Sequence, residues 1–247
     1  MSWLALLLIG VGVTDLVFSV RPARILPECI GALVALAVGL AAGLTDTRGV
    51  LALVVIAAAT VAWGQTVTRA FARGGRPWIP LTLLGVAVAV AVALAPLASP
   101  WRASSLVGRW LDTAPWPSLD GVSPDRFLLL VGLVLVQLST GNVLVRLVLA
   151  VTGTVNPGRH GDASDPETRL KGGRLLGPME RLVILGLGLA GELTAAGIVI
   201  AAKGLLRFPE LQSRSEQERI HQLTEYFLVG SFVSWLIPLT SLVLLRT

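Results

Sequence analysis

The stretch SWLALLLIGVGVTDLVFSV, residues 2–20, contains one charged residue, Asp15, in an otherwise apolar run. A helix of about 20 residues crosses the hydrocarbon core of a bilayer, and this stretch has that length. No basic segment precedes it, and Asp15 interrupts the run. We therefore expect an uncleaved first membrane span and not a signal peptide.

Six further segments have the same character, and together they predict an all-α, polytopic transmembrane helix bundle of about seven spans. The predicted spans are residues 2–20, 27–45, 49–68, 79–98, 127–151, 179–203 and 225–245. The fourth contains AVAVAVALA, residues 87–95, and such alternation is also typical of a strand. We expect a helix there, because an isolated strand in lipid would leave its backbone groups without hydrogen bonds.

The composition agrees with a membrane protein. Of the 247 residues, 54% are hydrophobic and 14% are charged, and the mean hydropathy is +0.77. A soluble domain carries about 25% charged residues, so the composition excludes a soluble enzyme and a nucleic-acid binder. The single cysteine, Cys29, excludes an internal disulfide, and no Cys/His spacing suggests a metal. No metal and no cofactor are therefore expected.

Three regions are predicted along the chain. Residues 1–151 hold five N-terminal transmembrane helices, residues 152–176 form a flexible polar connection, and residues 177–247 form a two-helix C-terminal region. The stretch 99–125 carries Trp101, Trp110 and Trp116. Tryptophan is enriched at the headgroup level of membranes, so this stretch is expected to lie on the membrane surface.

The distribution of Lys and Arg predicts the orientation. With the N-terminus outside, the inside connections and their flanks hold 12 of the 20 basic residues and the outside ones hold 8. Inner connections of membrane proteins carry the excess of basic residues. The sequence thus predicts a multipass protein of the cytoplasmic (inner) membrane, with the N-terminus outside and the C-terminus inside.

Glu192 is the charged residue that most needs an explanation, because it lies at the centre of the predicted span 179–203. A charge at the bilayer centre costs about 2.5–3.5 kcal/mol even on insertion scales. Arg181, Glu192 and Lys203 are spaced eleven apart, which places them on one stripe of a continuous helix. We therefore expect Glu192 to face the bundle and not lipid.

Span five carries a second polar stripe of Ser139, Asn142 and Arg146, at spacings of three and four. Asp15 in the first span is another acid that needs a partner. Two interpretations stay open. These groups satisfy one another and hold the helices together, or Asp15, Asn142, Arg146 and Glu192 line a hydrated pocket. Two further acids, Glu28 and Glu225, lie at span ends, where water is expected to reach them.

The C-terminal third shows a recognisable pattern in three stretches, GGRLLGPMERLVI (172–184), IAAKGLLRFPEL (200–211) and TEYFLVGSFVSW (224–235). It resembles the end of an uncharacterised family of bacterial multipass membrane proteins. The resemblance rests on residues that include Gly173, Gly177, Glu180, Arg181, Lys203, Arg207 and Glu225. It implies that the members of that family have in common the charges near the membrane surfaces, which are Glu180, Arg181, Lys203, Arg207 and Glu225 in this chain. The family supplies no activity, cofactor or catalytic residue.

Two functions from different classes fit the sequence. The first is a transporter, a lipid-handling protein or a membrane component of an assembly, with a polar intramembrane site around Glu192. The alternative is an integral-membrane enzyme acting on a lipid or isoprenoid, with a buried acid as proton donor. The expected partners are membrane lipids, together with a small-molecule or lipid substrate and an oligomeric or partner membrane protein. Nucleic acid is not expected.

Overall fold

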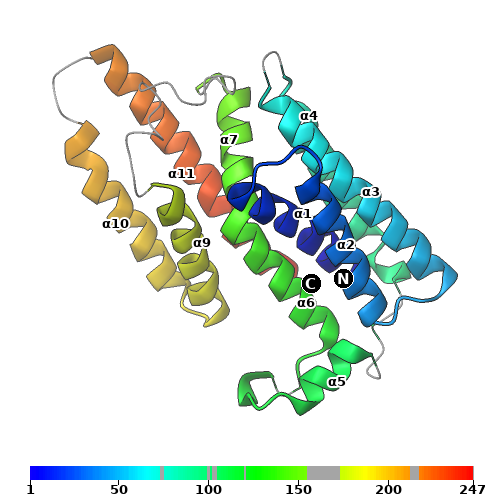
Figure 1. Ribbon diagram of the computed structural model, residues 1–247. Coiled ribbons are helices and arrows are strands. Elements are labelled where there is room, and N and C mark those ends of the chain that lie inside the picture. The colour runs from blue at the N-terminus through cyan, green and yellow to red at the C-terminus, as the bar shows by residue number, and fades with distance from the viewer. Residues whose placement is uncertain are drawn as a thin grey trace. The chain divides into compact units, whose positions relative to one another are not determined.

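The computed structural model describes residues 1–72, 75–98, 101, 105–119, 121–154, 173–211 and 217–246, without the side chains at 118, 173–175, 203, 204, 206–211 and 217–225. The regular elements of these residues are all helical (Figure 1). The main helices are α1 (Ser2–Val20), α2 (Leu26–Ala41), α3 (Thr47–Ala70), α4 (Trp78–Ala93), α5 (Leu106–Thr113), α6 (Pro124–Leu135), α7 (Gly141–Val151), α9 (Gly173–Leu189), α10 (Leu193–Leu211) and α11 (Gln217–Arg246).

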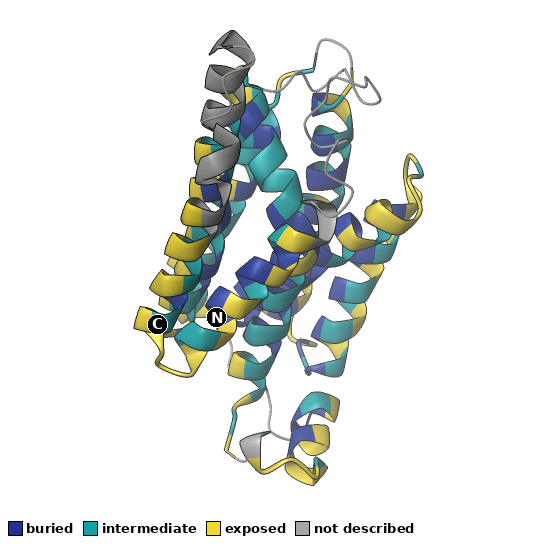
Figure 2. Cartoon of the chain, turned by 90° about the vertical axis from the view of Figure 1, so that its left-hand side faces the viewer, coloured by how far each residue is buried: buried dark blue, intermediate teal, exposed yellow. Residues whose placement is uncertain are grey.

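Four stretches are long and apolar enough to cross a membrane: Ser2–Val20, Thr47–Ala70, Pro124–Val151 and Tyr226–Arg246. Three shorter apolar helices cover Leu26–Ala41, Trp78–Ala93 and Leu193–Ala202. Large apolar side chains such as Leu33, Leu51 and Val86 are exposed along these helices, and Figure 2 shows the exposed positions in yellow. Apolar faces of this extent suit lipid better than water. The helices thus indicate a membrane location.

The chain divides into two compact units, of which unit 1 comprises residues 1–69 and 79–140. Helix α1 forms its core and packs against α2 and α6. The side chains of Leu4, Ala5 and Leu6 are fully buried. Glycine permits the close approach of α1 and α2, because a Cβ atom at Gly31 would overlap Thr14 Oγ1.

Unit 2 comprises residues 70–78 and 141–247. Helix α11 packs against α7 and α9, and α9 packs against α10. Gly188 on α9 lies directly against the Leu242 side chain of α11, so a Cβ atom there would overlap it. The predicted connection 152–176 lies largely outside the described residues, which resume at the start of α9.

The predicted span 179–203 is not one helix, and this is the main correction to the sequence analysis. Helix α9 ends at Leu189 and α10 begins at Leu193. Gly191 has φ +84°, its N–H bonds Gly188 O, and the N–H of Glu192 bonds Leu187 O. This pair of bonds is a Schellman motif, which ends a helix at a glycine in the left-handed region. The sequence therefore encodes a hairpin, with α9 and α10 side by side in Figure 1.

The predicted span 127–151 is continuous but irregular. It runs as α6, a π-helical segment at Val136–Thr140, and α7. A π turn inserts an extra residue and so shifts the helical register. Ser139 then belongs to unit 1, whereas Asn142 and Arg146 belong to unit 2. The single polar stripe predicted from α-helical spacing is therefore divided between two units.

Substituting Gly191 with alanine tests the hairpin. The new Cβ would meet no neighbouring atom, so the effect isolates the left-handed backbone, which costs roughly 1–2 kcal/mol for a residue other than glycine. We expect Gly191→Ala to lower the unfolding free energy in mild detergent by about 1 kcal/mol. Gly186→Ala is the matched control, because its Cβ also meets open space but its backbone is helical. Equal effects of the two substitutions would contradict the turn.

Candidate functional site

Asp15 lies on α1 in the interior of unit 1, where only 6% of its surface is exposed. The indole Nε1 of Trp63 on α3 donates to both carboxyl oxygens, at 3.1 Å and 3.2 Å. Trp63 is itself fully buried, so its N–H is committed to this carboxyl group. The acid that the sequence left without a partner is therefore held by a tryptophan from another helix.

Glu28 is a second buried carboxyl group, on the first turn of α2. Only 2% of its surface is exposed, although its place near a span end predicted contact with water. Gln65 Nε2 of α3 donates to Glu28 Oε1 at 3.1 Å and to the carbonyl oxygen of Arg24 at 3.3 Å. The other oxygen, Oε2, is buried without a hydrogen-bond partner.

The two carboxyl groups face the same turn of α3. Trp63 bonds Asp15, the next residue, Gly64, lies against the Glu28 side chain, and Gln65 bonds the Glu28 carboxyl. A Cβ atom at Gly64 would overlap Glu28 Cγ, so glycine makes room for the acid. We call Asp15, Glu28, Trp63, Gly64 and Gln65 the carboxyl cluster.

Among the described residues, no cation pairs with the carboxyl groups of this cluster. Within the part of the chain that the structure describes, no Lys or Arg nitrogen lies within 4.0 Å of the Asp15 or Glu28 carboxyl oxygens. Buried charges in proteins are paired, bind a cation or take up a proton. The donors that make hydrogen bonds of normal geometry to the two carboxyl groups are neutral, one indole and one amide. The cluster therefore has the chemistry of a site that holds a proton or a small cation.

Two hydroxyl groups of the π-helical segment complete this region of unit 1. Ser139 Oγ donates to Gly12 O on α1 at 2.8 Å and also lies 2.9 Å from Leu135 O. Thr140 interacts with Asp15, and its hydroxyl is buried without a hydrogen bond of normal geometry. The segment thus brings polar side chains against α1 near Asp15. Ser139 serves helix packing.

Unit 2 holds a separate polar network around Arg181, of which 1% is exposed. Its Nη1 donates to Ser234 Oγ on α11 at 3.1 Å, and its Nη2 donates to Asn142 Oδ1 on α7 at 2.7 Å. The guanidinium lies against Gly141, where a Cβ atom would come within 2.7 Å of Nε. One planar fork thereby joins three helices.

The residues next to Arg181 extend the network. Glu180 is buried, and Trp235 Nε1 donates to its Oε1 at 2.8 Å. The Arg146 guanidinium lies 4.9 Å from the centroid of the Phe71 ring, a cation–π contact within unit 2. The contacts of Glu180 and Arg181 join α9 to α7 and α11. Polar contacts that link several helices in this way favour a structural role.

The structure places the predicted site residues in three different settings. Asp15 and Ser139 are in unit 1, and Asn142, Arg146, Glu180 and Arg181 are in unit 2. Glu192 is exposed at the α9–α10 turn, so the expected mid-span acid facing the bundle is wrong. Its carbonyl accepts the first hydrogen bond of α10, from Ala196 N–H. The side chains of Lys203, Arg207 and Glu225 lie outside the described residues.

Sequence reasoning missed Trp63 and Gln65 because they lie 48 and 37 residues from Asp15 and Glu28, so no local spacing links them. A signal was present nonetheless: Trp63, Gly64 and Gln65 interrupt the apolar run of α3 together. Among the described residues, no group of three or more His, Cys, Asp or Glu side chains could hold a metal ion.

Comparisons of the chain with protein families, curated proteins and solved structures gave no match. The carboxyl cluster therefore has to be interpreted from its own chemistry.

Replacing Trp63 with phenylalanine tests the bond to Asp15. The ring is kept but the N–H donor is lost, which leaves a buried carboxyl unsatisfied. We expect a loss of about 1–3 kcal/mol in unfolding free energy, measured by denaturation in detergent. Trp78→Phe is the control, since Trp78 is exposed. In an Asp15→Asn background the effect of Trp63→Phe should shrink, and an unchanged effect would show that the ring alone matters.

Proposed function

We propose that this chain is a multipass integral membrane protein of the transport class, and that Asp15 and Glu28 bind the proton that it moves. The observation that carries the proposal is the pair of buried carboxyl groups on two apolar helices, held by Trp63 and Gln65 and not paired with any cation of the described residues. Ionisable groups within membrane spans mark ion paths and proton relays by default.

The arrangement suits a group that changes its protonation state. The indole and amide donors can hold a carboxylate, and a neutral acid can occupy the same place without an unpaired charge. Glu28 Oε2 has no partner in the described structure, so a proton there would leave every existing bond intact. A lipid-handling protein or a purely structural subunit does not require two such groups at one level of α3.

The alternative, an integral-membrane enzyme acting on a lipid or isoprenoid, has less support. Such an enzyme would use Asp15 as its proton donor and would need aromatic faces around a cationic intermediate. Trp63 meets Asp15 through its N–H edge and not through its ring face.

We further propose that the protein lies in the cytoplasmic (inner) membrane with both termini outside. The α9–α10 hairpin returns the chain to the side from which α9 starts, whether the two helices cross fully or enter partway. Five crossings precede the hairpin in the sequence segmentation and α11 adds one, so the number of crossings is even. Lys203, Arg207, Arg214 and Arg219 then move inside and Arg246 moves outside. The basic residues become 15 inside to 5 outside, a stronger bias than 12 to 8.

Cysteine accessibility tests this orientation. In a Cys29→Ser background, Thr247→Cys should react with a membrane-impermeant maleimide in intact cells. Ala163→Cys, in the connection before α9, should react only after the membrane is permeabilised. The Cys29→Ser substitution removes the native exposed thiol. Protection of Thr247→Cys in intact cells would restore an odd number of crossings and contradict the proposed orientation.

Proton flux tests the function. The full chain in liposomes containing a pH-sensitive dye should acidify the lumen when a potassium diffusion potential, negative inside, is imposed. Asp15→Asn and Glu28→Gln keep the shape and hydrogen bonds of the cluster but cannot exchange the proton, so their flux should fall to that of empty liposomes. Glu192→Gln is the matched control because Glu192 is exposed at a turn. Full flux in the Asp15 and Glu28 variants, or wild-type flux equal to empty liposomes, would refute the proposal.

A further inference from the structure

The carboxyl cluster lies close to one end of unit 1. Glu28 is two residues from the start of α2, about 3 Å along the helix axis, and Asp15 is five residues from the end of α1, about 8 Å. The connection between these two helix ends carries Arg21 and Arg24, which are exposed. A charged side chain is costly inside the hydrocarbon core, so this connection lies at an aqueous face. Glu28 is therefore the carboxyl group nearer to water, although it is itself buried.

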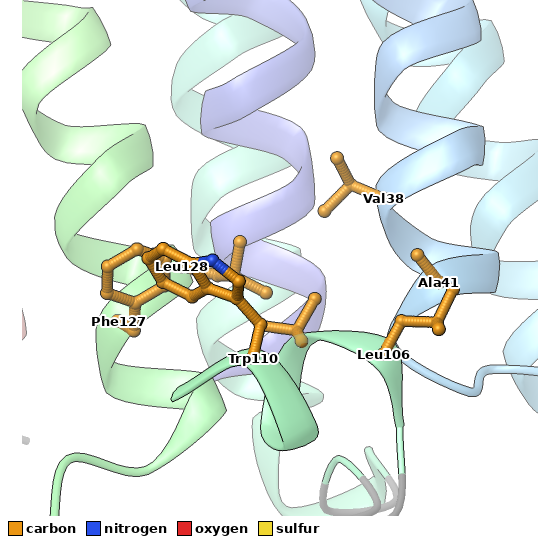
Figure 3. Close-up of a pocket in the computed structure, with 7 residues that line it drawn as sticks. Val38, Ala41, Leu106, Trp110, Phe127 and Leu128 are labelled. Carbon is orange, nitrogen blue, oxygen red and sulfur yellow. The ribbon is translucent and has the colours of Figure 1, made fainter. Parts of the chain in front are cut away.

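The opposite end of α2 has a different character. Val38 and Ala41 of its last turns line an apolar pocket together with residues of α5 and α6 (Figure 3). None of the side chains that line this pocket is ionisable. The ionisable side chains of α2, Glu28 and Cys29, both lie in its first turn. Proton exchange by this helix is therefore confined to the end that carries the cluster.

The side chain of Gln65 links Glu28 to the connection between α1 and α2. Its Nε2 donates to Glu28 Oε1 at 3.1 Å and to the carbonyl oxygen of Arg24 at 3.3 Å. Glu28 is 2% exposed, whereas Gln65 is half-buried and Arg24 is exposed. A single amide group thus reaches from the buried carboxyl group to the exposed connection.

Gln65 is also the member of the cluster that is free to move. Gly64 has no side chain, and a Cβ atom there would overlap Glu28 Cγ. Trp63 is fully buried. The half-buried Gln65 side chain, in contrast, can change its rotamer, as exposed side chains do within nanoseconds. Because an amide does not take up a proton near neutral pH, Gln65 can uncover the acid but does not relay the proton itself.

We propose that Gln65 is the positioning residue that gates proton exchange between Glu28 and the aqueous phase on the side of the α1–α2 connection. In the closed arrangement, its two hydrogen bonds hold the carboxyl group and keep water away. When the amide turns away, water reaches Glu28, and a proton passes from this water to Oε2, which has no hydrogen-bond partner among the described residues. Asp15, held by Trp63, does not exchange at this face. The inference rests on the proposed function, because it names the side from which the same site is loaded.

Carboxyl labelling of the full chain in detergent tests the gate. A water-soluble carbodiimide with glycine ethyl ester converts carboxyl groups that water reaches into amides, and peptide mass spectrometry gives the rate at each acid. Gln65→Ala should raise the rate at Glu28 by about tenfold, because the loss of two hydrogen bonds favours the open state by about 1.4 kcal/mol. Thr66→Ala is the matched control, since the hydroxyl of the half-buried Thr66 bonds carbonyl oxygens of its own helix.

Asp15 should stay unlabelled in both variants, which would show that the helices still pack around Trp63. Gln65→Ser replaces Gln65→Ala if the latter fails to give a monodisperse protein. An unchanged rate at Glu28 after removal of the amide, or a rate at Asp15 that rises in parallel, would overturn the proposal.

The side of exchange provides the second arm. In sealed vesicles, a membrane-impermeant maleimide and an Ala23→Cys substitution in a Cys29→Ser background report which side holds the α1–α2 connection. A membrane-impermeant carbodiimide should label Glu28 of the Gln65→Ala variant from that side, and labelling from the other side would overturn the proposal. Neither readout depends on transport. If Glu28 labelling responds to Gln65→Ala while proton flux equals that of empty liposomes, the gate stands and the proposed function alone is refuted.

Discussion

The Asp15 carboxyl group lies on an apolar helix and only 6% of the residue is exposed, so its hydrogen bonds have to come from the protein. This constraint determines much of unit 1. Helix α3 must present Trp63 at the level of Asp15, which fixes both the rotation and the height of α3. Gly64 and Gln65 then follow at the same level and receive Glu28 of α2. Three helices are thereby locked in register by side chains and not by apolar packing alone, which in lipid has little direction.

In unit 2, a charged side chain, Arg181, makes the polar contacts that join the helices. The Arg181 guanidinium donates to α7 and α11 at once, and the neighbouring Glu180 receives the indole of Trp235. Adjacent residues of α9 thus engage adjacent residues of α11. The two polar sites differ in kind, however. The Nη1 and Nη2 atoms of Arg181 both donate within this network, whereas Glu28 keeps one buried carboxyl oxygen without a hydrogen-bond partner among the described residues.

The apolar segments of the sequence predicted α1 with its observed bounds, Ser2–Val20. The predicted bounds of α2, α3 and α4 differ from the observed ones by about five residues or fewer. The predicted end of α11 also agrees, but the helix begins earlier than predicted. The prediction failed at Glu192, because the eleven-residue spacing was interpreted on an unbroken helix, whereas the helix ends before Gly191. A glycine in an apolar run can let a neighbouring helix approach closely or can end its own helix, and the backbone dihedral angle φ distinguishes the two roles. Asp15 was recognised as an acid in need of a partner, but Trp63 is 48 residues away, and no local spacing encodes that contact.

The turn at Gly191 also has an electrical consequence. Glu192 is the formal charge at the tip of the α9–α10 hairpin, where it lies at the N-terminus of α10 and complements the positive end of that helix. In the proposed orientation, insertion of the hairpin carries this carboxylate toward the outer face. A membrane potential that is negative inside favours outward movement of a negative charge by about 2.3 kcal/mol per 100 mV for a full crossing. The resting potential of the cell would therefore help to insert the hairpin and to hold it in place.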